Sequence, residues 1–160
     1  MPLHPDCAAY MQKSAEWAAA RGLPATWELP HARARQVYRD FITTSGRPMP
    51  EMARVEEIRI PTRAGDCPGR LLIPAGDRSK PLPVIVYYFS GGYVIGGLDE
   101  SEHEARRLAA RTPAIVVAAG YRVAPEHRFP AAAEDAYDAV TWAAANAQRR
   151  LLIPASSVTS

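Results

Sequence analysis

Two short apolar runs constrain this chain more than any other feature of its sequence. Residues 84–89 read Val-Ile-Val-Tyr-Tyr-Phe and residues 114–119 read Ala-Ile-Val-Val-Ala-Ala, without the alternation of polar and apolar residues that a half-exposed strand shows. Continuous apolar runs of this length are typical of strands in a parallel sheet that is buried on both faces. Helical patterns separate and follow the two runs, so the sequence predicts an α/β fold from residue 84 onward.

The segments after the two runs contain helix start and stop signals. Asp99 followed by Glu102 is an Asp variant of the capping box, which predicts an N-cap at Asp99 and a helix over residues 99–111. Pro113 ends that helix, because proline cannot continue it. A further helix is predicted from residue 130 to about residue 147.

The first part of the chain predicts two helices followed by a hairpin. Residues 5–22 are rich in alanine, and a second helix follows Pro30, where one apolar stripe is formed by Ala34, Val37, Tyr38, Phe41 and Ile42. Strands are predicted at about residues 55–60 and 69–73, on either side of a turn at Gly65-Asp66.

Composition and charge exclude several classes of protein. The chain has 160 residues, of which 48% are hydrophobic and 22% charged, which predicts a single compact core. The net charge of +2 comes from scattered arginines, and no basic cluster indicates nucleic-acid binding. The longest apolar runs are too short to span a bilayer. The N-terminus shows no secretory signal, so we expect a cytoplasmic protein in which Cys7 and Cys67 are free thiols.

The run at residues 84–89 leads directly into the pair Gly91-Gly92. A strand that ends in glycines presents backbone N–H groups without side chains in front of them, which suits stabilisation of a developing oxyanion. The alternative for a lone glycine pair is a simple turn after a strand. Residues 91–97 match neither a dinucleotide-binding fingerprint nor a P-loop, so the sequence predicts no phosphate-bearing cofactor.

The order of these motifs resembles the hormone-sensitive-lipase-like branch of the α/β-hydrolase fold, a family of carboxylesterases and lipases. The resemblance covers residues 1–147 and rests on two N-terminal helices, the hairpin, Val86-Tyr-Tyr-x-x-Gly-Gly, Leu98-Asp99, Tyr121-Arg122, Ala124-Pro-Glu-His127, and Phe129-Pro130 followed by Glu134-Asp-Ala136. It implies the N-terminal half of an α/β-hydrolase fold, in which two cap helices and a hairpin precede parallel strands that alternate with helices.

The resemblance also implies roles for several residues. The His-Gly-Gly-Gly loop of the family aligns with residues 89–92, so Gly91 and Gly92 are the implied oxyanion-hole donors, with Phe and Ser at the first two positions. Tyr93 follows the loop and would line an acyl or alcohol pocket, with core packing as its alternative. The implied substrate is a small acyl ester, and no cofactor or metal is expected. Arg122 and Glu126 are expected to be structural, as a buried charge pair or loop brace.

The chain lacks the nucleophile elbow of the family. The sequence contains no Gly-x-Ser-x-Gly, and Ser156 and Ser157 have no flanking glycines. We therefore expect an ester hydrolase that acts by acyl transfer to a serine but is truncated before the nucleophile, so that this chain is inactive alone. The alternative is a non-catalytic binding or self-association module. The expected divisions are cap helices and linker at 1–52, a partial core at 53–147 and a divergent tail at 148–160.

The resemblance predicts the strand order as well. The family order 1-2-4-3-5 implies that the strand at residues 84–89 lies at a sheet edge here, and an exposed edge favours a homo-oligomer or self-association. The remaining histidines are not expected to act in catalysis. His127 matches a loop histidine of the family, and His103, between two glutamates, is expected on a solvated helix face.

Overall fold

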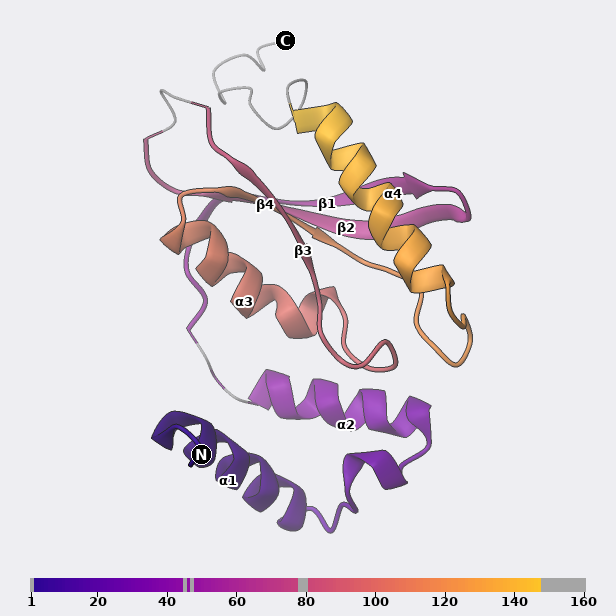
Figure 1. Cartoon of the computed structure of the whole chain (residues 1–160). Helices are drawn as coiled ribbons and strands as arrows, with labels where there is room; N and C mark the ends of the chain where they lie inside the picture. Colours follow the sequence, from indigo (N-terminus) through magenta and orange to yellow (C-terminus); the bar gives the residue numbers. More distant parts are fainter. Residues whose placement is uncertain (1, 45, 47, 78–80, 148–160) are drawn as a thin grey trace. The chain divides into compact units, whose positions relative to one another are not determined.

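The computed structural model describes residues 2–44, 46, 48–77 and 81–147 (Figure 1). The chain divides into two compact units, residues 1–46 and the segment from residue 47 onward. The first unit contains α1 (Pro5–Ala19), a short 3-10 helix η1 (Thr26–Glu28) and α2 (His31–Thr44). The two long helices confirm the sequence prediction, although α1 ends three residues before Gly22.

The apolar stripe of α2 forms the core of the first unit. Ala34, Val37 and Phe41 are buried, as the helical spacing predicts. From α1, Tyr10 and Trp17 pack edge-on against the Phe41 ring, with centroid distances of 5.8 and 5.4 Å. Aromatic side chains on α1 therefore cover the stripe of α2.

The second unit is a four-stranded sheet with one helix on each face (Figure 1). Its strands are β1 (Met52–Thr62), β2 (Gly65–Pro74), β3 (Val84–Tyr88) and β4 (Ile115–Ala119), and its helices are α3 (Leu98–Arg111) and α4 (Ala131–Asn146). The order is β1-β2-β4-β3, as predicted. The β1–β2 and β2–β4 pairs are antiparallel, and β3 pairs with β4 in parallel.

Side chains on the two faces of β4 belong to two different cores. Ile115, Val117 and Ala119 pack in the cluster that contains residues of α4. Val116 and Ala118 pack in the cluster that contains residues of α3. Because side chains alternate between the faces of a strand, a strand covered by a helix on each face must be apolar at every position. This explains the continuous apolar run in the sequence.

β3 lies at the end of the strand order in the described sheet. Its five residues are all half-buried, whereas the five residues of β4 beside it are all buried. The difference follows from position, because β3 has a neighbouring strand on one side and β4 has one on both. The predicted self-association would use this edge of β3.

Two sequence predictions about α3 are wrong. The helix begins at Leu98 after Gly97, no side chain caps it, and Asp99 lies in its first turn. Asp99 instead accepts a hydrogen bond from Arg70 of β2 at 2.8 Å, and Glu102 pairs with the same guanidinium. The Arg70 side chain is only 12% exposed, and a cation at that depth needs carboxylate partners. His103 is also buried rather than solvated.

None of the helices in the described ranges has both the length and the hydropathy that a membrane-spanning helix needs.

We predict unequal costs for two identical substitutions in the sheet. Val117 on β4 is fully buried and Val55 on β1 is 41% exposed. Val117→Ala should lower the free energy of unfolding by about 2 kcal/mol, since it removes roughly two methylene equivalents and leaves a cavity. Val55→Ala should cost less than about 1 kcal/mol. Urea denaturation measures both, and equal losses would contradict the two-sided burial of β4.

Candidate active site

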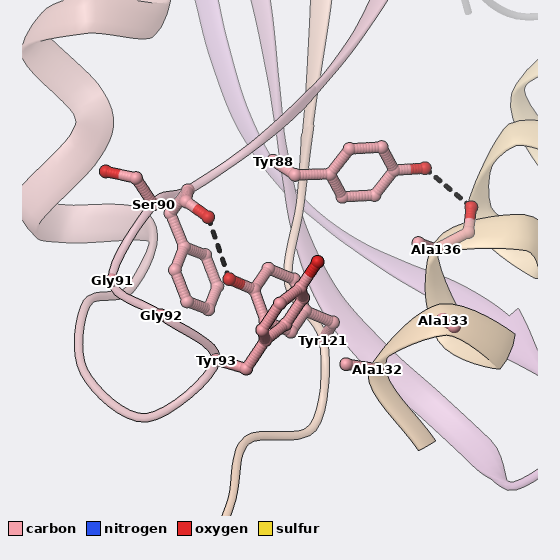
Figure 2. Close-up of a pocket in the computed structure, with 10 residues that line it drawn as sticks. Tyr88, Ser90, Gly91, Gly92, Tyr93, Tyr121, Ala132, Ala133 and Ala136 are labelled. Carbon is pink, nitrogen blue, oxygen red and sulfur yellow. Dashed lines mark hydrogen bonds between the residues drawn. The ribbon is translucent and has the colours of Figure 1, made fainter. Parts of the chain in front are cut away.

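The loops that follow β3 and β4 meet at one edge of the sheet. These strands are parallel, so their carboxyl ends point the same way, and ligand sites of open α/β sheets form at that edge. Together with the first turns of α4, the loops enclose a pocket of about 380 Å³ (Figure 2). The lining residues are Tyr88, Phe89, Ser90, Gly91, Gly92, Tyr93, Tyr121, Ala132, Ala133 and Ala136.

The loop after β3 is a closed turn that requires glycine. Gly91 has a φ of 142°, and a Cβ at this position would overlap the carbonyl oxygen of Ile95. That close approach exists because the carbonyl of Gly91 accepts hydrogen bonds from the N–H groups of Val94 and Ile95, at 3.1 and 3.0 Å. The glycine therefore serves the tight backbone geometry of the turn.

The backbone donors of the glycine pair are available. Within the described part of the chain, the N–H groups of Gly91 and Gly92 donate to no protein acceptor. Gly92 has a φ of 60°, and a Cβ there would have no neighbour within 4 Å. Both residues line the pocket, so these N–H groups are candidate donors to an oxygen atom of a bound molecule.

Tyr121 holds the loop in place. Its ring stacks on that of Phe89, with a centroid distance of 4.1 Å and an interplanar angle of 10°. Its hydroxyl donates to the carbonyl of Phe89 at 2.8 Å (Figure 2). The N–H of Ala124 donates to the carbonyl of Tyr93 at 2.8 Å, which fixes the other end of the loop. The sequence analysis noted Tyr121 as part of a motif but assigned it no role in the loop, because its partner Phe89 lies 32 positions away.

Tyr88 lies on the other side of the pocket, and its hydroxyl is also engaged. It donates to the carbonyl of Ala136 in α4 at 2.6 Å (Figure 2). Burial raises the pKa of both Tyr88 and Tyr121, so both hydroxyls stay protonated donors at neutral pH. Each hydroxyl already donates a hydrogen bond to a backbone carbonyl. Tyr88 and Tyr121 therefore contribute mainly aromatic surface to the pocket, which the alanines of α4 also line.

Tyr93 lines the pocket at its edge. Its side chain is 65% exposed, and its ring meets that of Tyr121 edge-on at 6.1 Å. This exposure does not fit core packing, which was the alternative for Tyr93. The residue therefore lies where a bound molecule could contact it.

A buried charge pair joins the loop after β4 to α4. Arg122 donates to both carboxylate oxygens of Asp135 from its side chain, at 2.8 Å, and its backbone N–H donates to the same group at 2.9 Å. Burial alone would raise the pKa of the Asp135 carboxyl, but the hydrogen bonds and charge of Arg122 outweigh burial and lower it. Arg122 forms a charge pair, as predicted, but its main partner is Asp135. Glu126, which was expected to be buried with it, is exposed. His127 is exposed and does not line the pocket.

Cys7 and Cys67 are free thiols, as predicted, the first exposed and the second buried. Among the residues that the structure describes, no three His, Cys, Asp or Glu side chains gather closely enough to hold a metal ion.

Comparisons with known proteins agree with this geometry. A family described as an alpha/beta hydrolase fold matches residues 85–159. Carboxylesterase NlhH of Mycobacterium tuberculosis is 40% identical over 121 residues, which are 75% of this chain and 36% of that protein. Ethyl acetate hydrolase of Pseudomonas putida is 34% identical over 145 residues, which are 89% of this chain and 45% of that protein.

Solved structures of esterases are also similar to this chain. A hyperthermophilic esterase from Pyrobaculum calidifontis superposes with a TM-score of 0.72 at 35% identity, over 95% of this chain and 45% of that one. An ester hydrolase from the metagenome of Lake Arreo gives 0.82 at 31% identity, over 92% and 46%. The chain contains part of an α/β-hydrolase fold and is similar to carboxylesterases of the hormone-sensitive-lipase-like branch.

The chain spans less than half the length of these carboxylesterase relatives, and it contains part of the α/β-hydrolase fold. The family match continues past residue 147, into the segment that the sequence analysis set apart as a tail.

We predict that the hydroxyl of Tyr121 restrains the loop after β3. Tyr121→Phe keeps the ring but leaves the carbonyl of Phe89 without its donor, at a cost of about 1 kcal/mol. Amide hydrogen exchange at Val94 and Ile95, which close the loop, should become faster. NMR-detected exchange measures this effect.

Tyr88→Phe is the matched control for this experiment. It also removes one hydroxyl that donates to a buried backbone carbonyl, but that carbonyl belongs to α4. Exchange at Val94 and Ile95 should stay unchanged in the control. Equal acceleration in both variants would show a general loss of stability rather than a restraint on the loop.

The Arg122–Asp135 pair predicts a dependence of stability on pH. The pKa of Asp135 is lowered in the folded state, so its ionised form stabilises the fold above about pH 4, near the pKa of an unfolded Asp, and this contribution is lost as the pH falls further. Asp135→Asn should cost roughly 3 kcal/mol at pH 7 and make the loss of stability on acidification shallower. Asp66→Asn, at an exposed position, should change neither. Denaturant melts between pH 7 and pH 3 measure both variants, and parallel curves for wild type and Asp135→Asn would contradict this account.

Proposed function

We propose that this chain provides the oxyanion-binding side of a carboxylesterase site that hydrolyses small acyl esters. The observation that supports this proposal is the pair of unoccupied N–H groups at Gly91 and Gly92, which border a pocket at the carboxyl ends of two parallel strands. The relatives named as a carboxylesterase and an ethyl acetate hydrolase support the class of reaction and of substrate.

The chemistry follows from where negative charge develops. When a nucleophile adds to an ester carbonyl, the carbonyl oxygen becomes an oxyanion, and fixed N–H donors at hydrogen-bond distance stabilise it more than they stabilise the neutral ester. Gly91 and Gly92 would supply these donors without a side chain in the way. Tyr93, at the edge of the pocket, would contact the acyl or alcohol group.

The loop departs from the family at its first two positions. Phe89 stands where the family has histidine, and its buried ring stacks on Tyr121. We propose that this stack, with the hydrogen bond from Tyr121 to the carbonyl of Phe89, orients the two glycine donors in this chain. An aromatic contact would thus replace a histidine side chain as the support of the loop.

We further propose that these 160 residues do not complete the reaction alone. The sequence contains no Gly-x-Ser-x-Gly, so it does not supply the serine that would attack the ester. The attacking serine and its Asp and His partners would have to come from the other part of an α/β-hydrolase fold. The non-catalytic alternative is not favoured, because the relatives named above are esterases.

A chimera tests the oxyanion assignment. We expect the chain alone to show no hydrolysis of p-nitrophenyl acetate above background. Joined to the complementary part of a related esterase, it should become active. Gly92→Val keeps the N–H group, but its side chain would obstruct the approach of the oxyanion and should lower kcat by about 10²- to 10³-fold, the loss typical of one oxyanion donor. Steady-state kinetics of the chimera measure this change.

Gly22→Val in the same chimera is the matched control for backbone strain. Gly22 has the same φ of 60° and also has no neighbour within 4 Å of a Cβ, but it lies in the first unit. An unchanged kcat with Gly92→Val, or an equal loss with Gly22→Val, would rule out the oxyanion role.

A further inference from the structure

A second pocket lies along α3 and shares no lining residue with the first. Its volume is about 470 Å³, and it is bounded by two prolines that precede β1 and by one face of the helix. The lining residues are Pro48, Pro50, His103, Arg107, Ala110 and Arg111. The helix residues recur at intervals of three and four, so they project from one side of α3. Three of these four side chains are basic.

His103 provides an independent observation at this pocket. Its side chain is 10% exposed, and within the described part of the chain its Nδ1 is the one buried side-chain nitrogen or oxygen without a hydrogen-bond partner. The nearby Oε1 of Glu104 lies 3.7 Å away, too far for a hydrogen bond. A buried polar atom without a partner is unfavourable, so a ligand atom that hydrogen-bonds to Nδ1 would stabilise it. Nδ1 has almost no accessible surface, so this contact requires a rotation of the imidazole ring toward the pocket.

The two arginines are not used by the fold. Arg107 and Arg111 are exposed, and among the described residues neither forms an ion pair, hydrogen bond or ring contact. The neighbouring Arg106, in contrast, has partners in the fold: it pairs with Glu102 and donates to the carbonyl of Pro50 at 3.2 Å. Arg106 thereby fixes the proline wall of the pocket.

A structural role explains only part of this pattern. A cation in the last turn of a helix, such as Arg111, interacts favourably with the helix dipole. That interaction needs neither a pocket nor the burial of His103 one turn before Arg107. The helix dipole therefore does not explain why His103, Arg107 and Arg111 all line the same pocket.

We propose that this pocket binds a small oxyanion, a carboxylate or phosphate group of a small molecule. Guanidinium groups bind such anions through paired N–H donors, and Nδ1 of His103 would donate a further hydrogen bond when it bears a proton. Glu104 opposes an anion here, but two arginines outweigh one carboxylate. Pro48, Pro50 and Ala110 offer apolar surface for a short group beside the anion. The site is separate from the proposed ester chemistry and does not depend on it.

Equilibrium dialysis of the full chain tests this proposal, with radiolabelled inorganic phosphate as one probe and acetate as the other. The ionic strength is kept constant with sodium chloride. We expect saturable binding at one site, and at least tenfold weaker binding for the double variant Arg107→Gln/Arg111→Gln. Both positions are exposed, so the variant should keep its fold, which circular dichroism checks. Tighter binding of one probe identifies the preferred anion.

Arg128→Gln is the matched control, because it removes one exposed arginine outside the pocket and should leave binding unchanged. Imidazole ¹⁵N NMR gives a second measurement: Nδ1 of His103 should shift on addition of phosphate or acetate but not of chloride. Binding that does not saturate, that chloride displaces equally well, or that persists in the double arginine variant would overturn the proposal.

Discussion

The burial of β4 on both faces is the constraint on which the second unit depends. Val116 and Val117 are each fully buried, but they face different helices and belong to different cores. A strand in this position fixes α3 on one face and α4 on the other. It also brings the loops after β3 and β4 to the same edge of the sheet. The candidate active site is therefore a consequence of packing that lies outside it.

The candidate site consists mainly of backbone, and backbone donors are only as well placed as the loop that holds them. Gly92 has little packing of its own, since a Cβ there would meet nothing, whereas Gly91 lies against the carbonyl of Ile95. The position of the pair comes from neighbours: the Phe89–Tyr121 stack, the hydroxyl of Tyr121, and the N–H of Ala124. Preorganised donors need no rearrangement when charge develops, so these supporting contacts would matter for the proposed chemistry without touching a reacting atom.

Much of the fold could be predicted from the sequence because its signals are local. Apolar runs and helical stripes identified the four strands and four long helices of the described residues, and the family resemblance supplied the strand order. The hairpin turn lies at residues 63–64, and the predicted turn residues Gly65 and Asp66 belong to β2. The glycine pair could be proposed for the same reason, because Gly91 and Gly92 are adjacent in the sequence and directly follow an apolar run. What the sequence could not predict depends on contacts between distant segments.

Asp99 shows this limit. A capping box is a local pattern, but Arg70 lies 29 positions away on β2. Its guanidinium is mostly buried and needs carboxylate partners, so it pairs with Asp99 and Glu102. His103 shows it again, because two flanking glutamates suggested solvent while the helix face turned it inward. Tyr121 is the third example, because its contact with Phe89 joins two segments that are 32 positions apart.

The stacking of Phe89 on Tyr121 connects these observations. A polar side chain can support a loop through hydrogen bonds that it makes itself, whereas a phenylalanine can only pack. Here Tyr121 supplies the donor: its ring packs on Phe89, and its hydroxyl donates to the carbonyl of the same residue. Arg122, the next residue, is anchored to the buried carboxylate of Asp135. The charge pair thus connects the segment that holds the loop to α4. Because Arg122 compensates its charge, a fully buried Asp135 is tolerated on an otherwise apolar face of the helix.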